Sequence, residues 1–410
     1  MKIPLALPAL LLGTSLLCGT GRAQIQAQPK MSFLHAQGAR IETQTGQPTI
    51  LRGFNLGNWL VEEMWLSPFD TDPPAGSTLP KITDHVRLRQ VFTTRFGQQK
   101  ADQLLELWRR NFITPADFVR LKADGANCVR LPFTYDLESE PGGLFRWLDF
   151  AVAQAKANGI YIVLDLHGAP GRQGIEHHTG EEGVNLFFKD AKYRVQTEVL
   201  WAKIAAHFKD EPAVAGYDLL NEPVGAPNAA TIHLVHNQLY QAVRAVDPNH
   251  IIIMEDGYKN PDQMPDPAIM GWKNVVYSFH SYKFNAKNAD DYDSHLKDWV
   301  MAQSKTVQDK WSVPVYIGEW NLEPHGTPEK FRQYVQTFEA GNLSWSLWTY
   351  KITGKWGGSQ WGLYTPKMGL KAINPFTDSF EQILAAIPEI RTENLVRNDE
   401  LEAALGPFKP

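Results

Sequence analysis

The chain has 410 residues, of which 43% are hydrophobic and 21% are charged, and this composition is ordinary for a soluble globular protein with an ample core. A formal net charge of −5 and the lack of a basic cluster exclude a strongly basic nucleic-acid-binding protein. Only two cysteines are present, and Cys128, which lies in an apolar strand pattern, is predicted to be a buried thiol without a disulfide partner.

The N-terminal residues have the pattern of a secretory signal peptide. Lys2 precedes the apolar stretch Ile3–Cys18, and Gly19–Ala23 then ends in the small residue that a signal peptidase prefers. The apolar stretch is too short for a stable membrane span. Processing as a lipoprotein at its cysteine is the alternative, which the bulky Leu17 disfavours. We therefore expect a secreted protein, either periplasmic or extracellular.

The remaining chain shows no repeat and no linker long enough to divide it. The predicted segments are a signal peptide at 1–23, a linker at 24–31, a single domain at 32–390 and a C-terminal tail at 391–410. Removal of the signal lowers Lys plus Arg from 40 to 38 against 45 acidic residues. We expect the mature protein to be a monomer that binds neither nucleic acid nor a membrane.

Eight short runs rich in Val, Ile, Leu and aromatic residues predict strands that are covered on both faces. They lie at Thr49–Leu56, Asn127–Phe133, Ile160–His167, Val214–Glu222, His250–Asp256, Val275–Tyr282, Val313–Trp320 and Leu343–Lys351. Helical patterns separate them, at Thr114–Gly125, Phe145–Asn158, Ala191–Phe208, Ala229–Val246, Ala289–Ser304, Pro328–Ala340 and Phe376–Ala386.

This alternation predicts a (β/α)8 TIM barrel as a single α/β domain. Ser32–Thr49 predicts a short N-terminal hairpin that closes the bottom of the barrel, and Asp84–Arg110 predicts a helical insertion after the first strand. A doubly wound sheet is the alternative fold, but no glycine-rich phosphate loop follows any of the strands.

Polar and aromatic side chains gather at the predicted carboxyl ends of these strands, where the active site of a barrel lies. They are Arg130, His167, Asn221, Glu222, His280, Tyr282, Glu319 and Trp348. Each has a structural alternative, because a glutamate can be a solvated surface residue, an arginine a clamp and a histidine a core residue. Their collection at one rim favours a site.

The composition of this rim indicates glycoside hydrolysis. That reaction needs one carboxyl group that carries a proton and one that is ionised, and Glu222 and Glu319 come from different strands. Arg130 is a permanent cation that can keep a carboxylate ionised. Sugar rings stack on flat apolar surfaces, and candidates for such a surface are Trp348, Trp320, Trp345, Trp356 and Trp361, although Trp345 fits the core better.

Seven sequence blocks together resemble glycoside hydrolase family 5. They are LRGFNLGNW (Leu51–Trp59), NCVRLPF (Asn127–Phe133), LDLHGAPG (Leu164–Gly171), LLNEP (Leu219–Pro223), FHSY (Phe279–Tyr282), IGEW (Ile317–Trp320) and SLWTYK (Ser346–Lys351). The blocks follow the order of the family and span the whole predicted barrel. The resemblance implies a retaining β-glycosidase that needs no cofactor and no metal.

The resemblance also implies a role for each matching residue. Glu222 matches the acid/base and Glu319 the nucleophile, and Asn221 matches the residue that binds the 2-hydroxyl of the reacting sugar. Arg130 and Tyr282 match the pair that orients the nucleophile. His167 and His280 match histidines that contact the sugar and support the acid/base, and Trp348 matches the floor under the reacting ring.

Within the family, LGNWLVEE (Leu56–Glu63) and DLHGAPGRQG (Asp165–Gly174) resemble the exo-β-1,3-glucanases most closely. Glu63 matches a glutamate that closes a pocket around a terminal glucose, so a β-glucan oligosaccharide or polysaccharide is the implied substrate. Two departures are the loop IEHHTG (Ile175–Gly180), with Glu176 displaced and His177 in its place, and KITGKWGGSQWGLY (Lys351–Tyr364), which replaces an acidic loop. Within it, Trp356–Tyr364 is the predicted aglycone side.

Three other functions stay open. An endo-β-1,4-glucanase or a β-glucosidase of the same fold keeps the two carboxylates and changes the loops. A barrel that only binds carbohydrate would be expected to lose one carboxylate, and both are present here. A metal site at Glu176, His177 and His178 is disfavoured, because adjacent histidines point apart and no third ligand has suitable spacing.

Overall fold

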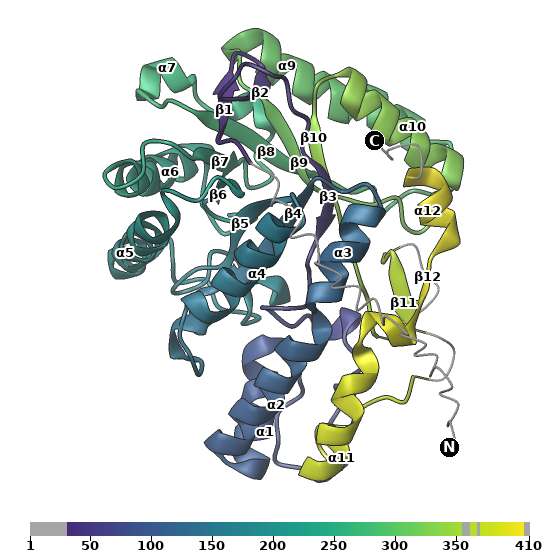
Figure 1. Ribbon diagram of the computed structural model, residues 1–410. Coiled ribbons are helices and arrows are strands. Elements are labelled where there is room, and N and C mark those ends of the chain that lie inside the picture. Colours follow the sequence, from purple (N-terminus) through teal and green to yellow (C-terminus); the bar gives the residue numbers. More distant parts are fainter. Residues whose placement is uncertain (1–30, 355–360, 367–369, 406–410) are drawn as a thin grey trace, which may run out of the picture.

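The structure, a computed structural model, describes residues 31–354, 361–366 and 370–405, so the predicted signal peptide and nearly all of the linker lie outside the described residues. Eight parallel strands close into a barrel in the order β10-β3-β4-β5-β6-β7-β8-β9 (Figure 1). These strands are β3 (Arg52–Asn55), β4 (Cys128–Thr134), β5 (Tyr161–Gly168), β6 (Val214–Asp218), β7 (Ile251–Glu255), β8 (Val275–Ser281), β9 (Val315–Trp320) and β10 (Ser344–Leu347). The predicted (β/α)8 barrel is confirmed.

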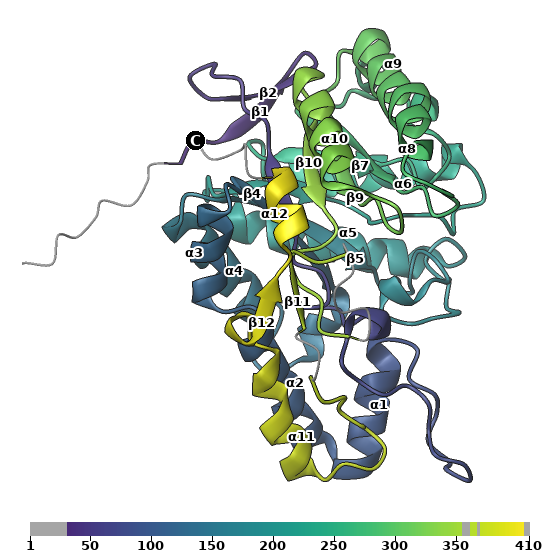
Figure 2. The same cartoon turned by 90° about the vertical axis from the view of Figure 1, so that its right-hand side faces the viewer.

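Helices cover the outside of the barrel (Figures 1 and 2). They are α1 (His85–Phe96), α2 (Gln98–Phe112), α3 (Pro115–Ala123), α4 (Phe145–Ala157), α5 (Ala191–Phe208), α6 (Ala229–Arg244), α7 (Pro267–Met270), α8 (Asp291–Ser294), a π-helix (His295–Met301), α9 (Ala302–Trp311), α10 (Pro328–Ala340), α11 (Phe380–Ala386) and α12 (Asp399–Leu405). Short 3-10 turns lie at Met64–Leu66, Tyr135–Ser139, His177–Thr179, Pro261–Gln263, Ile387–Ile390 and Thr392–Asn394.

Several predicted elements have different ends in the structure. The eighth predicted strand was extended to Lys351, but β10 ends at Leu347. The predicted helix Ala289–Ser304 is the continuous run α8, π-helix and α9, which reaches Trp311. The helix predicted at Phe376–Ala386 begins at Phe380, because Ser379 and Gln382 form a capping box there. The fourth predicted strand was extended to Glu222, but β6 ends at Asp218, although Leu219 and Asn221 still donate main-chain hydrogen bonds to the neighbouring strands β7 and β5.

The N-terminal hairpin lies at the opposite end of the barrel from α1 and α2 (Figures 1 and 2). Its strands, β1 (Leu34–Gln37) and β2 (Arg40–Thr43), pair antiparallel. Leu34 and Ile41 are buried in one cluster with Cys128 and with Ile251, which begins β7. This apolar cluster fills the amino-terminal end of the barrel, so the predicted closure of the bottom by a hairpin is confirmed.

The helical insertion after the first barrel strand is also confirmed, and it anchors the loop that follows β3. The buried guanidinium of Arg109, in α2, donates to Glu62 at 3.1 Å and also bonds Glu140. Burial raises the pKa of Glu62, but the charges of Arg109 and His85 outweigh that effect and lower its pKa to about 2. The loop is therefore tied to the insertion one residue before Glu63.

The segment predicted as a C-terminal tail is folded as far as residue 405. Its strand β12 (Leu395–Arg397) pairs antiparallel with β11 (Tyr364–Pro366), and α12 lies against α10. None of the helices in the described ranges has the length and apolar character needed to cross a membrane.

Candidate active site

Arg130 lies at the centre of the candidate site. Its position in β4 points the side chain into the barrel, where it is fully buried, and its guanidinium donates to Glu319 Oε1 at 2.8 Å and to Asn221 Oδ1 at 2.8 Å. Three further carboxylates surround the same group: Asp165 at 3.2 Å, Asp218 at 3.0 Å and Glu255 at 3.0 Å. Burial lowers the pKa of Arg130, but these carboxylates outweigh it and raise the pKa well above its ordinary value.

Glu319, near the end of β9, is held from two sides. Arg130 contacts one carboxylate oxygen, and the hydroxyl of Tyr282 donates to the other at 2.8 Å. The sequence predicted that Arg130 and Tyr282 orient this carboxylate, and the structure brings both residues to it. Burial and the charge of Glu222 raise the pKa of Glu319, against the opposing pull of His280 and Arg130.

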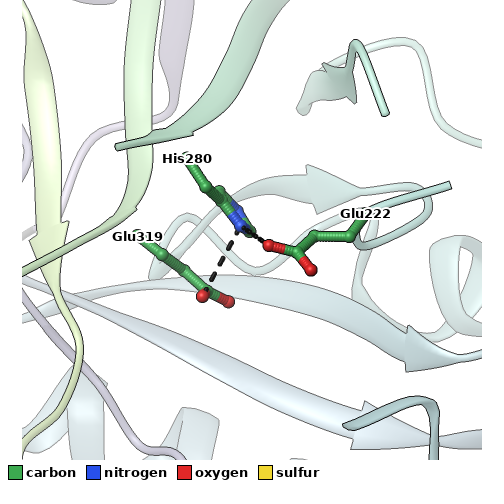
Figure 3. A group of neighbouring side chains, drawn as sticks. All are labelled: Glu222, His280 and Glu319. Atoms are coloured by element: carbon green, nitrogen blue, oxygen red, sulfur yellow. Dashed lines mark hydrogen bonds and ion pairs between the residues drawn. The ribbon is translucent and has the colours of Figure 1, made fainter. Parts of the chain in front are cut away.

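Glu222 follows the end of β6 with a φ of 39°, in the left-handed region that non-glycine residues rarely adopt. Its carboxylate faces three side chains on different elements and accepts hydrogen bonds from His280 and Tyr258. His280 Nδ1 lies 2.6 Å from Oε1, the hydroxyl of Tyr258 donates to the same oxygen, and His178 Nε2 lies 3.3 Å from Oε2. Figure 3 shows His280 between the two glutamates, with Nδ1 also 3.5 Å from Glu319.

The pKa shifts of Glu222 and His280 favour a proton on His280 in the free protein. Burial raises the pKa of Glu222, but His178, His280 and Tyr258 outweigh it, so the net pKa is lowered. Burial lowers the pKa of His280, but the carboxylates of Glu255, Glu319 and Glu222 outweigh it and raise the pKa well above its ordinary value. From the sequence we expected the acid to carry its own proton, whereas the contacts favour an ion pair of Glu222 with His280.

The two glutamates lie close together. One oxygen from each and a nitrogen of His280 all lie within 4.8 Å of one another. Carboxyl groups of retaining glycosidases are ~5–5.5 Å apart, whereas inverting enzymes need roughly 6.5–9.5 Å to admit a water. The arrangement suits a double displacement rather than a direct attack by water.

A cavity of about 630 Å³ opens over this pair. It is lined by Glu63, Trp65, His167, Glu176, His177, His178, Glu222, Tyr258, Tyr282, Phe284, Glu319, Trp348 and Trp361. Trp348, whose peptide bond to Thr349 is cis, stacks on His167 with ring centroids 5.6 Å apart and planes 11° apart. Of the predicted sugar-facing residues, Glu63, His167 and Trp348 line this cavity, whereas Asn221 and His280 are not part of its lining.

Several buried polar atoms in or beside the lining of this cavity have no hydrogen-bond partner among the described residues. They include Glu63 Oε1, Glu176 Oε2 and the amide nitrogen of Asn221. The other oxygen of Glu63 accepts from Trp65 at 2.9 Å and faces His177 at 3.1 Å. Because buried polar groups are normally satisfied, these free acceptors and the free donor fit the hydroxyl groups of a bound sugar.

Several side chains of the site were missed in the sequence. Glu255 ends β7, Tyr258 follows it, and Phe284 follows β8. The others are Trp65, which lines the cavity, and Asp165 and Asp218, which contact Arg130. The tyrosine reaches Glu222 only because Gly257 and Tyr258 both have positive φ, of 59°. Glu255 ends a predicted strand, as the recognised residues do, so the rule that found them could also have found it.

The tryptophans divide between the core and the cavity. Trp320, a candidate sugar platform in the sequence, is a core residue instead, fully buried against Tyr334 and Phe338. Trp345 is buried in the core as predicted. In the predicted aglycone block Trp356–Tyr364, Trp361 lines the cavity, whereas 356–360 lie outside the described residues.

Two groups of side chains in the described part of the chain have the composition of a metal site. Glu222, His280 and Glu319 form one, and Asp165, Asp218 and Glu255 form the other. The guanidinium of Arg130 already contacts all three carboxylates of the second group, so a cation is held there by the protein itself. His177 and His178 face different carboxylates, Glu63 and Glu222 respectively, rather than one shared point.

Comparisons with known proteins agree with this geometry. Residues 88–354 match the sequence model described as cellulase (glycosyl hydrolase family 5). The chain is 28% identical over 372 residues to a beta-xylosidase of Phanerodontia chrysosporium, covering 83% of this chain and 75% of that protein. It is 30% identical over 320 residues to a probable glucan 1,3-beta-glucosidase A of Aspergillus niger, covering 75% of this chain and 72% of that protein. A rutinosidase structure from Aspergillus niger has the same fold, with a TM-score of 0.57 at 18% identity over 76% of this chain and 92% of that one.

Proposed function

Because the chain belongs to glycoside hydrolase family 5, we propose that it hydrolyses β-glucosidic bonds of β-glucans from a chain end, as an exo-β-1,3-glucanase does. The observation that carries the chemistry is the buried pair Glu222 and Glu319, bridged by His280. The glycosidase class and the retaining outcome follow from the family. The residue roles, the substrate and the exo mode are our proposal.

In the first step Glu319 attacks the anomeric carbon while the glycosidic C–O bond breaks. Arg130 and the hydroxyl of Tyr282 hold the attacking carboxylate at 2.8 Å each, which fixes its orientation and favours its charged form. Glu222 takes the proton of His280 Nδ1 through their 2.6 Å contact and delivers a proton to the leaving oxygen. The products are a glucosyl ester of Glu319 and a free alcohol.

In the second step water cleaves that ester. Glu222, now ionised, accepts the proton of the water as its oxygen bonds to the anomeric carbon, and Glu319 leaves as a carboxylate. Glu222 then returns this proton to His280 Nδ1, which restores the starting state. The free amide N–H of Asn221 fits a hydrogen bond to the 2-hydroxyl of the sugar, and the ring of Trp348 provides its floor. Two displacements restore the original anomeric configuration.

Acidic and aromatic side chains gathered in the cavity support the exo mode. Glu63, Trp65 and Trp361 all line the cavity, and the rings of Trp65 and Trp361 are 5.1 Å apart. The unpartnered oxygens of Glu63 and Glu176 fit hydroxyl groups at the non-reducing end of a glucosyl unit. Glu176 is displaced from the position of the acidic residue that the family resemblance implies, but it still places a carboxylate oxygen in the cavity lining. His177, which stands at that position, lies 3.1 Å from Glu63.

A second cavity, of about 670 Å³, supports a leaving group on the side of Glu222. It shares Tyr258, Tyr282 and Phe284 with the first cavity and continues past Lys283 and Trp299. Phe284 is 69% exposed and stacks on Tyr282 at 5.1 Å, so it presents a ring face to a second sugar. We place the aglycone here rather than at Trp356–Tyr364, because the acid/base lies on this side.

The test is a product time course on laminarin, carboxymethyl-cellulose and an aryl β-glucoside, with Glu319→Ala as the blank. Glucose as the first product from laminarin supports the proposal. A spread of oligosaccharides, or activity on the cellulose derivative alone, would replace it with an endo-β-1,4-glucanase. Activity on the aryl glucoside alone would indicate a β-glucosidase, and sugar binding without turnover would indicate a carbohydrate-binding barrel.

The residue roles have a separate test. Glu319→Gly should abolish hydrolysis, and azide should restore turnover with inverted product because a small anion can enter on the nucleophile side. Restored turnover with retained configuration would contradict the role of Glu319. We also propose that the protein is exported with removal of residues 1–23, which N-terminal sequencing of the mature protein would test.

A further inference from the structure

Glu255 connects the parts of the candidate active site although it does not line the catalytic cavity. It is the last residue of β7 and is 2% exposed. Its Oε2 accepts the main-chain N–H of Glu222 at 2.7 Å. Its Oε1 lies 3.0 Å from Arg130 Nη2 and 3.3 Å from His280 Nε2. One carboxylate thus contacts the acid/base, the partner of the nucleophile and the histidine between them.

The contact with the main chain has a structural reason. Glu222 has a φ of 39°, a conformation that costs a non-glycine residue energy and persists only where surrounding contacts enforce it. Leu219 and Asn221 still donate to the carbonyls of Ile253 and Leu166 on the neighbouring strands, but the N–H of Glu222 has no main-chain partner among the described residues. The hydrogen bond to Glu255 satisfies this N–H, and it fixes the direction in which the carboxylate of Glu222 leaves the chain.

The contact with His280 fixes the ring. Nδ1 faces Glu222 at 2.6 Å, and Nε2 faces Glu255 at 3.3 Å. Because each nitrogen faces a carboxylate, both can carry a hydrogen, and the ring is held as an imidazolium whose Nδ1–H points at the acid/base.

We propose that Glu255 is the positioning residue of the acid/base, which holds the main chain of Glu222 and presents the proton of His280 to its carboxylate. This inference rests on the proposed role of Glu222. During glycosylation the Nδ1–H bond of His280 breaks as an O–H bond forms on Glu222, and the proton that Glu222 gives up goes to the leaving oxygen. Glu255 stays ionised throughout and never touches the substrate.

The neighbouring charges determine the sign of its effect on pH dependence. The groups that face Glu222, His280 and Glu255 are His178 before α5, Arg130 on β4, Asp165 on β5, Asp218 on β6, Asp256 and Tyr258 after β7, Tyr282 after β8, and Glu319 on β9. Removal of the negative charge of Glu255 weakens the hold of the His280–Glu222 pair on its proton. The basic limb of kcat/KM should therefore move to lower pH.

Glu255→Gln tests the inference with two substrates that differ only in their need for an acid. On laminaribiose kcat/KM should fall ~100-fold or more, the size expected for loss of general acid catalysis. On 2,4-dinitrophenyl β-glucoside, whose leaving group needs no proton, kcat/KM should fall less than ~10-fold. Glu255→Asp, which keeps the charge but shortens the side chain, should restore the basic limb without full recovery on laminaribiose.

Asp218→Asn is the matched control. Asp218 also contacts Arg130, at 3.0 Å, and does not contact Glu222 or His280 through its side chain. Burial and the charge of Glu255 raise its pKa well above the ordinary value, and asparagine keeps the size of the side chain and an oxygen that can accept from Arg130. We expect both substrates to be affected alike and the basic limb to stay in place.

Equal losses on both substrates with an unmoved basic limb in Glu255→Gln would overturn the proposal, because they would indicate a purely structural role. Unchanged activity on both substrates would overturn it as well. Glu222→Ala on the same substrates separates this failure from that of the proposed function. If that variant loses both substrates equally, the role of Glu222 is wrong, whatever Glu255 does.

Discussion

The adjacent residues Glu62 and Glu63 should have different effects when they are substituted. We expect Glu62 to contribute mainly to the free energy of unfolding and Glu63 mainly to activity. Glu62 is fully buried and contacts Arg109 and His85, whereas Glu63 turns to the cavity wall. The pKa of Glu62 falls from 4.5 to about 2 on folding. At ~1.36 kcal/mol per pKa unit, the ionised carboxylate contributes about 3 kcal/mol to the free energy of unfolding.

Glu62→Gln should therefore lower the free energy of unfolding at pH 7 by about 3 kcal/mol, because it leaves Arg109 with fewer compensating charges. A group with a depressed folded pKa stabilises the protein above its unfolded pKa and loses that effect as pH falls towards the folded value. The difference between wild type and variant should thus be full above pH 5 and shrink between pH 4.5 and about 2.

Urea titrations at several pH values measure this difference. Glu63→Gln is the control, since its carboxylate accepts from Trp65 and His177, contacts that an amide oxygen can still make in part. It should cost less than ~1 kcal/mol of stability and most of the activity on laminarin. A Glu62→Gln penalty that is equal at pH 7 and pH 3, or absent at pH 7, would refute the reasoning.

Three further predictions concern single side chains. Tyr258→Phe removes the hydroxyl that donates to Glu222, so the basic limb of kcat/KM should move to higher pH with a ~2- to 10-fold loss in rate; an unmoved limb would argue against the contact. Cys128 should resist thiol reagents until the protein unfolds, since burial raises the pKa of its thiol, and rapid labelling of the native protein would contradict this. Burial lowers the pKa of Lys351 from 10.5 to about 8, so its charge costs about 3 kcal/mol below pH 8 and the cost disappears as pH rises to 10.5. Wild type should accordingly gain stability relative to Lys351→Met over that interval in urea titrations, and a constant difference would contradict it.

The sequence predicted the barrel because eight short apolar runs, typical of strands covered on both faces, alternate along the chain with helical patterns. Residues at the strand ends were predictable for the same reason, since Glu319 and His280 lie within β9 and β8 themselves. Tyr258 was not, because its reach to Glu222 depends on two consecutive positive φ angles that nothing in the sequence requires of a tyrosine. The end of β6 at Asp218 could not be predicted either, because Leu219 and Leu220 continue the buried apolar pattern beyond the last residue of the strand.

The charges under the cavity explain how one proton stays available there. Arg130 is the permanent cation among Asp165, Asp218, Glu255 and Glu319, so the carboxylates around it outnumber its charge. Ionising all of them in a buried space would be costly, and the pKa values of His280, beside Glu222, and of Asp218 are accordingly raised well above their ordinary values. An excess of buried carboxylates over fixed cations thus favours a proton on His280, which lies between Glu222 and the proposed nucleophile Glu319. A lysine at position 130 could not replace Arg130, because a single ammonium cannot contact these four carboxylates together as a planar guanidinium does.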